Sequence, residues 1–180
     1  MIVFITGGAK NGKSSLAQRL AVELSGGGSR YYVATMIPVD EEDRERIRRH
    51  IADRDGMGFE TVECGRDILS CLDKADKTGS FLLDSVTALL MNELFLPPDY
   101  SLNPEAGEKC AAELVELSQR VSNIVLVSDY IYSDACRYDQ VTETYRKALA
   151  LIDRRLAQIS DVVLELTAGS IVVHKGEYPI

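Results

Sequence analysis

Several features that mark other protein classes are missing from this sequence. No stretch approaches the roughly 20 apolar residues that a membrane span needs, so we expect no membrane span. The chain has only two histidines and four cysteines, none of them in a Cys-x-x-Cys pair. We therefore expect neither a zinc site nor disulfides, and we interpret the cysteines as small buried hydrophobic residues. They are Cys64, Cys71, Cys110 and Cys136.

Positive charge is also scarce. Lysine and arginine number 20 against 28 acidic residues, which gives a net charge of −8. That balance argues against a nucleic-acid partner held by bulk electrostatics. The chain begins with an apolar run and has no basic leader, so we expect a cytoplasmic protein. A length of 180 residues fits one domain, which we predict over residues 1–180.

Short apolar runs alternate with longer amphipathic segments. This alternation predicts an α/β fold, a mainly parallel sheet flanked by helices. The last two runs flank the turn Thr167-Ala168-Gly169-Ser170, which predicts a C-terminal antiparallel β-hairpin. We expect strands at residues 2–6, 31–35, 59–63, 81–84, 124–128, 162–166 and 171–174. We expect helices at residues 13–25, 40–54, 66–74, 85–94, 104–121 and 134–158.

The strongest motif lies between the first strand and the first helix. It reads Gly7-Gly8-Ala9-Lys10-Asn11-Gly12-Lys13-Ser14, a complete G-x-x-x-x-G-K-S phosphate-binding loop. Its glycines let the backbone wrap a phosphate, towards which the loop and helix N–H groups point. Lys13 is placed to offset the charge of the β- and γ-phosphates, and Ser14 to ligate Mg²⁺. We expect Lys13 to be exposed until phosphate arrives. The motif predicts a P-loop domain that binds ATP or GTP.

A second Mg²⁺ ligand is expected at the end of a neighbouring buried strand. Asp84 ends the apolar run Phe81-Leu82-Leu83 and fits that role beside Ser14. The alternative is that Asp84 caps the following helix by accepting backbone N–H bonds. The phosphate loop favours the metal-linked role.

The helix expected at residues 40–54 is rich in charge. Arg46, His50 and Arg54 are spaced by four residues and so share a face, while Ile47 and Ile51 are expected on its buried stripe. Such a face can bind a polyphosphate and hold a neutral imidazole as a nucleophile. On composition alone, a solvated helix with ion pairs such as Glu42 with Arg46 is the favoured reading. The other histidine, His174, is interpreted as structural.

Taken in order, these motifs resemble one family. They are Thr6-Gly7-Gly8 through Gly12-Lys13-Ser14, then Tyr32-Val33-Ala34-Thr35, then Arg46-Ile47-x-x-His50-x-x-x-Arg54, then Thr61-x-Glu63, and finally Asp84-x-x-Thr87-x-x-x-x-Asn92. Over about the first 95 residues the chain resembles the bifunctional adenosylcobinamide kinase and adenosylcobinamide-phosphate guanylyltransferase of cobalamin biosynthesis.

The resemblance implies a RecA-like domain, in a homotrimer, that carries out two reactions. A nucleoside triphosphate phosphorylates adenosylcobinamide, a corrinoid. GTP then transfers GMP to the new phosphate through a guanylylated histidine, whose position His50 occupies. Besides the phosphate loop, the resemblance assigns nucleotide contacts to Ala34, Thr35, Met36, Ile51, Ala52, Asp53, Arg54, Glu63 and Asp84.

The segment at residues 129–134 differs from the glycine-containing segment of that family. It begins Asp129-Tyr130, which adds bulk and negative charge at the carboxyl end of the fifth predicted strand. This difference predicts family-like nucleotide binding but different handling of the corrinoid. Two alternatives stay open: a diverged P-loop kinase or nucleotidyltransferase with another substrate, and a nucleotide-binding protein without turnover.

Overall fold

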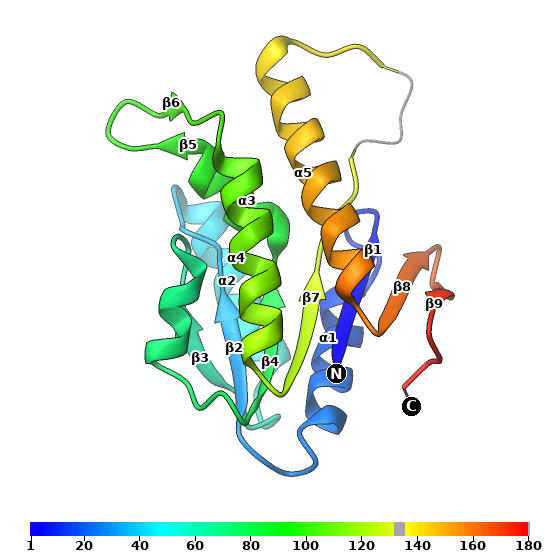
Figure 1. The fold of residues 1–180 in the computed structure, drawn as a ribbon. Coiled ribbons are helices and arrows are strands. Elements are labelled where there is room, and N and C mark those ends of the chain that lie inside the picture. Colours follow the sequence, from blue (N-terminus) through cyan, green and yellow to red (C-terminus); the bar gives the residue numbers. More distant parts are fainter. Residues whose placement is uncertain (132–135, 180) are drawn as a thin grey trace.

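A seven-stranded sheet forms the centre of the computed structural model, which describes residues 1–131 and 136–179. The strands lie in the order β3-β2-β4-β7-β1-β8-β9 (Figure 1). Every neighbouring pair is parallel except β8 and β9, which form the predicted antiparallel hairpin. The bounds are β1 Ile2–Gly7, β2 Arg30–Ala34, β3 Glu60–Glu63, β4 Ser80–Asp84, β7 Asn123–Val127, β8 Val162–Thr167 and β9 Ser170–Lys175.

Helices cover both faces of this sheet, because alternate residues of its central strands point to opposite sides. Helix α1 (Lys13–Leu24) packs on the face that carries Val3, Ile5 and Leu82. The other face carries Phe4 and Phe81 and is covered by three further helices (Figure 1). These are α3 Val86–Leu94, α4 Ala106–Arg120 and α5 Gln140–Ile159.

Three details differ from the sequence expectations. The helix expected at residues 66–74 is a short 3₁₀-helix, η1 (Ile68–Asp73), preceded by Asp67 with a φ of 45° that no regular α-helix contains. Helix α5 begins later than expected, after Asp139 caps it through the N–H groups of Val141 and Thr142; residues 134–135 of the expected helix lie outside the described residues. The strands β5 (Phe95–Leu96) and β6 (Ser101–Leu102) were not expected.

The helix that carries the histidine, α2 (Glu41–Asp53), is attached differently from the others. None of its residues is buried, and Ile51 is 52% exposed. The expected buried stripe of Ile47 and Ile51 is therefore wrong in this chain. Asp40 caps the helix by accepting the Asp43 N–H at 2.9 Å. The start of α2 is therefore set by this local hydrogen bond and not by burial of its side chains.

No helix within residues 1–131 and 136–179 has the length and apolarity that crossing a bilayer would require. Three of the cysteines are buried as expected, Cys64, Cys71 and Cys110. Cys136 is exposed, so the buried interpretation is wrong there. All four are free thiols.

Candidate active site

The glycine-rich motif forms the turn between β1 and α1. Gly7 and Gly12 have φ values of 150° and 85°, and Lys10 has a φ of 61°, so the turn uses backbone conformations that glycine adopts readily. Gly12 precedes α1 without a side-chain cap, which leaves the first N–H groups of the helix available to an anion. Asn11 ties the turn to β8 through a 3.2 Å bond from its side-chain amide to the Leu166 carbonyl. The local structure is that of a phosphate-binding loop.

Lys13 is not exposed, contrary to expectation. Only 5% of its side chain is accessible, and its ammonium donates to the Gly8 carbonyl at 2.7 Å. The ammonium also lies 2.5 Å from the Asp129 carboxylate. The loop lysine is thus already oriented along the loop and neutralised. Asp129 was not among the expected site residues, although its position just past β7 places it at the carboxyl edge of the sheet.

Asp84 ends β4 and does not cap the next helix. That cap is Ser85, whose hydroxyl accepts the Ala88 N–H at 3.2 Å. Asp84 instead accepts a 3.0 Å hydrogen bond from the hydroxyl of Tyr32 on β2. Burial disfavours the Tyr32 phenolate and Asp84 repels it, so the pKa of Tyr32 is raised well above its usual range. The helix-capping alternative for Asp84 is therefore wrong.

His50 faces the same carboxylate. Its Nδ1 lies 3.9 Å from Asp84 Oδ2, close enough for charge interaction but too long for a hydrogen bond. The imidazole is 34% exposed, so a substrate can reach it. The ion pairs within α2 join Arg48 to Glu41 and Glu45, and Arg44 to Glu41, at other positions of the helix. The expected pair of Glu42 with Arg46 is not formed in the described part of the chain.

Arg54 anchors the end of this helix to the sheet. It is 8% exposed, and its guanidinium lies 4.0 Å from the centre of the Tyr32 ring. It donates to the His50 carbonyl at 2.7 Å and to the Thr61 hydroxyl at 3.0 Å. The stacked guanidinium and the ring attract each other. Tyr32 therefore contacts both Arg54 and Asp84. The sequence placed Tyr32 in a motif but predicted no role for its side chain.

The other expected nucleotide contacts differ in how far they are buried. Thr35 is buried, and its hydroxyl donates to the Ser85 carbonyl at 2.8 Å and accepts the Ser85 N–H at 2.7 Å. Ala34 and Met36 are half-buried, and Glu63 is exposed at the end of β3. The last turn of α2 exposes Ile51, Ala52 and Asp53.

Ser14 and Asp84 supply the hard oxygen donors that Mg²⁺ prefers, so the expected metal fits this donor set. Among the described residues no group of three or more histidine, cysteine, aspartate or glutamate side chains surrounds a common point. A Mg²⁺ ion here would therefore complete its coordination with phosphate oxygens and water, as it commonly does beside bound nucleotides.

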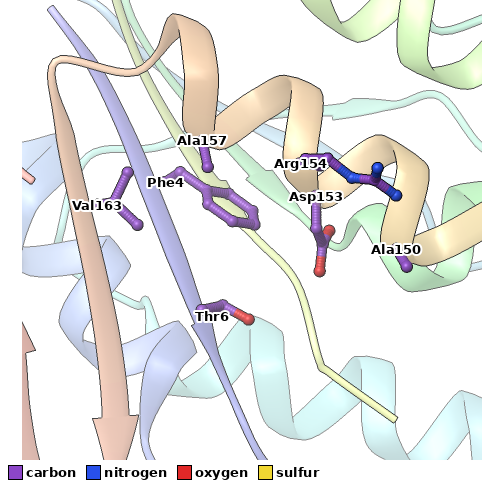
Figure 2. Close-up of a pocket in the computed structure, with 7 residues that line it drawn as sticks. All are labelled: Phe4, Thr6, Ala150, Asp153, Arg154, Ala157 and Val163. Carbon is purple, nitrogen blue, oxygen red and sulfur yellow. The ribbon is translucent and has the colours of Figure 1, made fainter. Parts of the chain in front are cut away.

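His174 lies apart from this cluster. Its Nε2 is 2.7 Å from Glu165 Oε2 in the β8–β9 hairpin, in accord with its structural interpretation. A cavity of about 350 Å³ lies between β1, β8 and α5, on the sheet face that carries Phe4 (Figure 2). It contains none of the expected site residues. Its lining is Phe4, Thr6, Ala150, Asp153, Arg154, Ala157 and Val163.

Some known proteins are similar to this chain in sequence, and others are similar to it in fold alone. The model of a family described as cobinamide kinase / cobinamide phosphate guanyltransferase matches residues 3–173. The bifunctional adenosylcobalamin biosynthesis protein CobU of Salmonella typhimurium is 28% identical over 94% of this chain and 97% of its own length. Protein CobP of Pseudomonas aeruginosa, which has the same description, is 30% identical over 96% of each chain.

The fold also resembles that of a KaiC-like protein of Pyrococcus horikoshii OT3. The TM-score is 0.54 at 13% identity, over 98% of this chain and 80% of the other, which supports the expected RecA-like fold alone. The match of the family model extends far beyond residue 95, where the resemblance by motif had ended.

Proposed function

The chain belongs to the cobinamide kinase / cobinamide phosphate guanyltransferase family, and from this premise we propose that it phosphorylates adenosylcobinamide and then transfers GMP from GTP to adenosylcobinamide phosphate. The second reaction passes through a guanylyl group on His50. The observation that supports this most is the 3.9 Å approach of His50 to Asp84, at the sheet edge that also carries the phosphate loop.

In the first reaction the loop and Lys13 hold the triphosphate. Positioning and charge stabilisation supply most of the catalysis of phosphoryl transfer. On binding, Lys13 exchanges Asp129 and the Gly8 carbonyl for phosphate oxygens. Mg²⁺, held by Ser14 and Asp84 together with the nucleotide, would neutralise charge that develops on the phosphate oxygens.

In the second reaction a nitrogen of His50 attacks the α-phosphorus of GTP and pyrophosphate leaves. A phosphate oxygen of the corrinoid then attacks the same phosphorus and releases the histidine, so that one displacement is divided into two. Asp84 faces Nδ1, and a carboxylate beside one ring nitrogen favours the proton there and leaves the other nitrogen free to attack. We therefore assign the new bond to Nε2.

We also propose that the enzyme works as a cytoplasmic homotrimer with nucleotide sites near subunit contacts. Val39 and Ile51, at opposite ends of the helix that carries His50, are 75% and 52% exposed, and such side chains favour a contact with another chain. Size-exclusion chromatography with light scattering should give about three times the 19.9 kDa of one chain.

The decisive experiment is labelling with α-³²P GTP and Mg²⁺. We expect a covalent label at His50 that survives alkali and is released by acid, as a phosphoramidate is. The His50→Ala variant should lose the label. His174→Ala is the matched control, because His174 is the only other histidine of the chain, and it should keep the label.

A label that persists in His50→Ala would reject the histidine route. Product analysis by mass spectrometry with adenosylcobinamide and GTP then separates the two remaining possibilities. Guanylylation without a corrinoid product would indicate a diverged enzyme with another substrate. Nucleotide-induced thermal stabilisation without any product would indicate a binding protein.

A further inference from the structure

Asp129 is held beside the phosphate loop by the residues on either side of it. The Ser128 N–H donates to the Ile5 carbonyl at 2.9 Å, and the Ser128 hydroxyl donates to Asp153 at 2.8 Å. The Tyr130 N–H donates to the Gly7 carbonyl, the first residue of the loop, at 3.3 Å. Because its backbone is fixed at both neighbours, Asp129 has a defined position and not that of a loose surface side chain.

The sheet order sets what lies around this carboxylate. Strand β7 lies between β1, which leads into the phosphate loop, and β4, which ends at Asp84. Asp129 follows β7, and so it lies between the loop and the candidate metal ligand. Its carboxylate contacts Lys13 at 2.5 Å and is 33% exposed, so it is reachable from solvent. Burial is the larger cause of the raised pKa of the Tyr145 phenol on α5, and Tyr145 lies close enough for the Asp129 charge to raise that pKa further.

We propose that Asp129 is the general base of the phosphorylation step, which accepts the proton of the acceptor hydroxyl. This inference rests on the proposed function. The hydroxyl oxygen forms a bond to the γ-phosphorus, and the bond from that phosphorus to the β,γ-bridging oxygen breaks. The hydroxyl proton passes to the Asp129 carboxylate and later to water, and a nucleoside diphosphate leaves.

The position of Lys13 explains how the carboxylate becomes available. An ammonium has three donors and no acceptor, and here the Lys13 ammonium donates to the Gly8 carbonyl and contacts the Asp129 carboxylate. When Lys13 turns to the phosphates, Asp129 loses its partner while remaining next to them. A base must lie within hydrogen-bond reach of the proton that it removes. A carboxylate next to the lysine that contacts the γ-phosphate meets that condition for an alcohol approaching this phosphate.

A simpler role would be that of a counter-ion to Lys13 in the absence of nucleotide. In that case removal of the charge would tighten nucleotide binding and would leave phosphoryl transfer unharmed. A general base gives the opposite kinetic pattern. It also affects one reaction only, because guanylylation uses a histidine nitrogen and no hydroxyl proton has to be removed.

The test compares Asp129→Asn and Asp129→Glu in the full chain. Asp73→Asn is the matched control, since it removes an exposed carboxylate at the end of η1. Phosphorylation of adenosylcobinamide and covalent labelling of His50 by GTP are measured side by side. In Asp129→Asn we expect kcat for phosphorylation to fall by about 10²-fold, the usual contribution of a general base. The nucleotide KM should not rise, labelling of His50 should continue, and Asp129→Glu should recover part of the rate.

Continued labelling shows that Asp129→Asn is folded and binds nucleotide. An unchanged kcat with tighter nucleotide binding would overturn the proposal in favour of a counter-ion. Loss of both reactions would also overturn it, because Asp129 would then position the nucleotide. If the wild-type chain itself does not phosphorylate adenosylcobinamide, the proposed function fails, and this failure is seen without any variant.

Discussion

The hydroxyl of Tyr32 joins two parts of the candidate site, and its removal tests whether that link is real. The change is Tyr32→Phe, which keeps the ring under the Arg54 guanidinium and deletes the 3.0 Å hydrogen bond to Asp84. The side chain of Asp84 is only 10% exposed. Water can therefore replace the lost donor only in part, and the folded state should be destabilised.

The expected magnitude follows from the partner's charge. A hydrogen bond to an ionised group contributes about 1.5–3 kcal/mol, more than one between neutral groups. We expect the free energy of unfolding to fall by about 2 kcal/mol, which corresponds to a Tm lower by roughly 4–8 °C for a chain of this length. In a double-mutant cycle with Asp84→Asn, the two changes should be non-additive by about 1 kcal/mol or more.

Urea denaturation followed by circular dichroism measures these values. Tyr31→Phe is the matched control, because Tyr31 is the neighbouring residue, is 7% exposed and packs on Phe81 at a centroid distance of 5.1 Å. It should lose much less stability than Tyr32→Phe. Equal losses in the two variants, or additive energies in the cycle, would show that the bond to Asp84 contributes nothing specific.

Three further changes test other parts of the structure. Gly7→Ala should destabilise the chain by about 2 kcal/mol or more and weaken nucleotide binding, because the added Cβ would lie 2.5 Å from the Leu166 carbonyl oxygen at a strained φ. A Cβ added at Gly12 would meet no atom within 4 Å, so Gly12→Ala should lose less stability in urea denaturation. Lys13→Ala should abolish both transfer reactions while circular dichroism shows an intact fold, since the Asp129 it leaves unpaired is partly exposed; near wild-type rates would reject the nucleotide site. Glu113 has a raised pKa, chiefly because of burial. Its protonated form therefore favours the folded state, and this contribution is lost as the pH rises through its folded pKa. Glu113→Gln should be more stable than wild type by a few tenths of a kcal/mol at pH 7, and the difference should vanish near pH 4.

Much of the fold could be predicted because its signals are local. The buried parallel strands appear as short apolar runs, such as Phe81-Leu82-Leu83. The phosphate-loop motif predicts a strand before it and a helix after it. The C-terminal hairpin follows from a two-residue turn in which Ala168 and Gly169 both have positive φ. The strands β5 and β6 could not be predicted, because two residues are too few for any periodic pattern.

The site was harder to predict than the fold, because its contacts join distant parts of the chain. His50 and Asp84 were identified by motif, but their 3.9 Å approach depends on where α2 is anchored. That anchor, Arg54 on Tyr32, is a cation–π contact between a helix end and a strand, and the spacing of residues in the sequence does not predict it. Asp129 was missed as a partner of Lys13 for the same reason: residues 13 and 129 meet only because β7 lies beside β1.

The buried stripe expected for Ile47 and Ile51 shows a different limit of sequence patterns. An i, i+4 pair of isoleucines marks the apolar face of a helix but does not say what covers it. None of the residues of α2 is buried, and Arg54 holds the end of the helix to the sheet by stacking and hydrogen bonds. A helix attached in this way is restrained by few contacts, and regions with few buried contacts open at low free-energy cost. The phosphate loop and Asp129, by contrast, are tied to the central strands by the Asn11 side chain and by the backbone hydrogen bonds of Ser128 and Tyr130. The two proposed reactions therefore use supports of unequal stiffness: phosphorylation takes place between parts of the rigid sheet edge, whereas guanylylation depends on a histidine whose helix is held chiefly through Arg54.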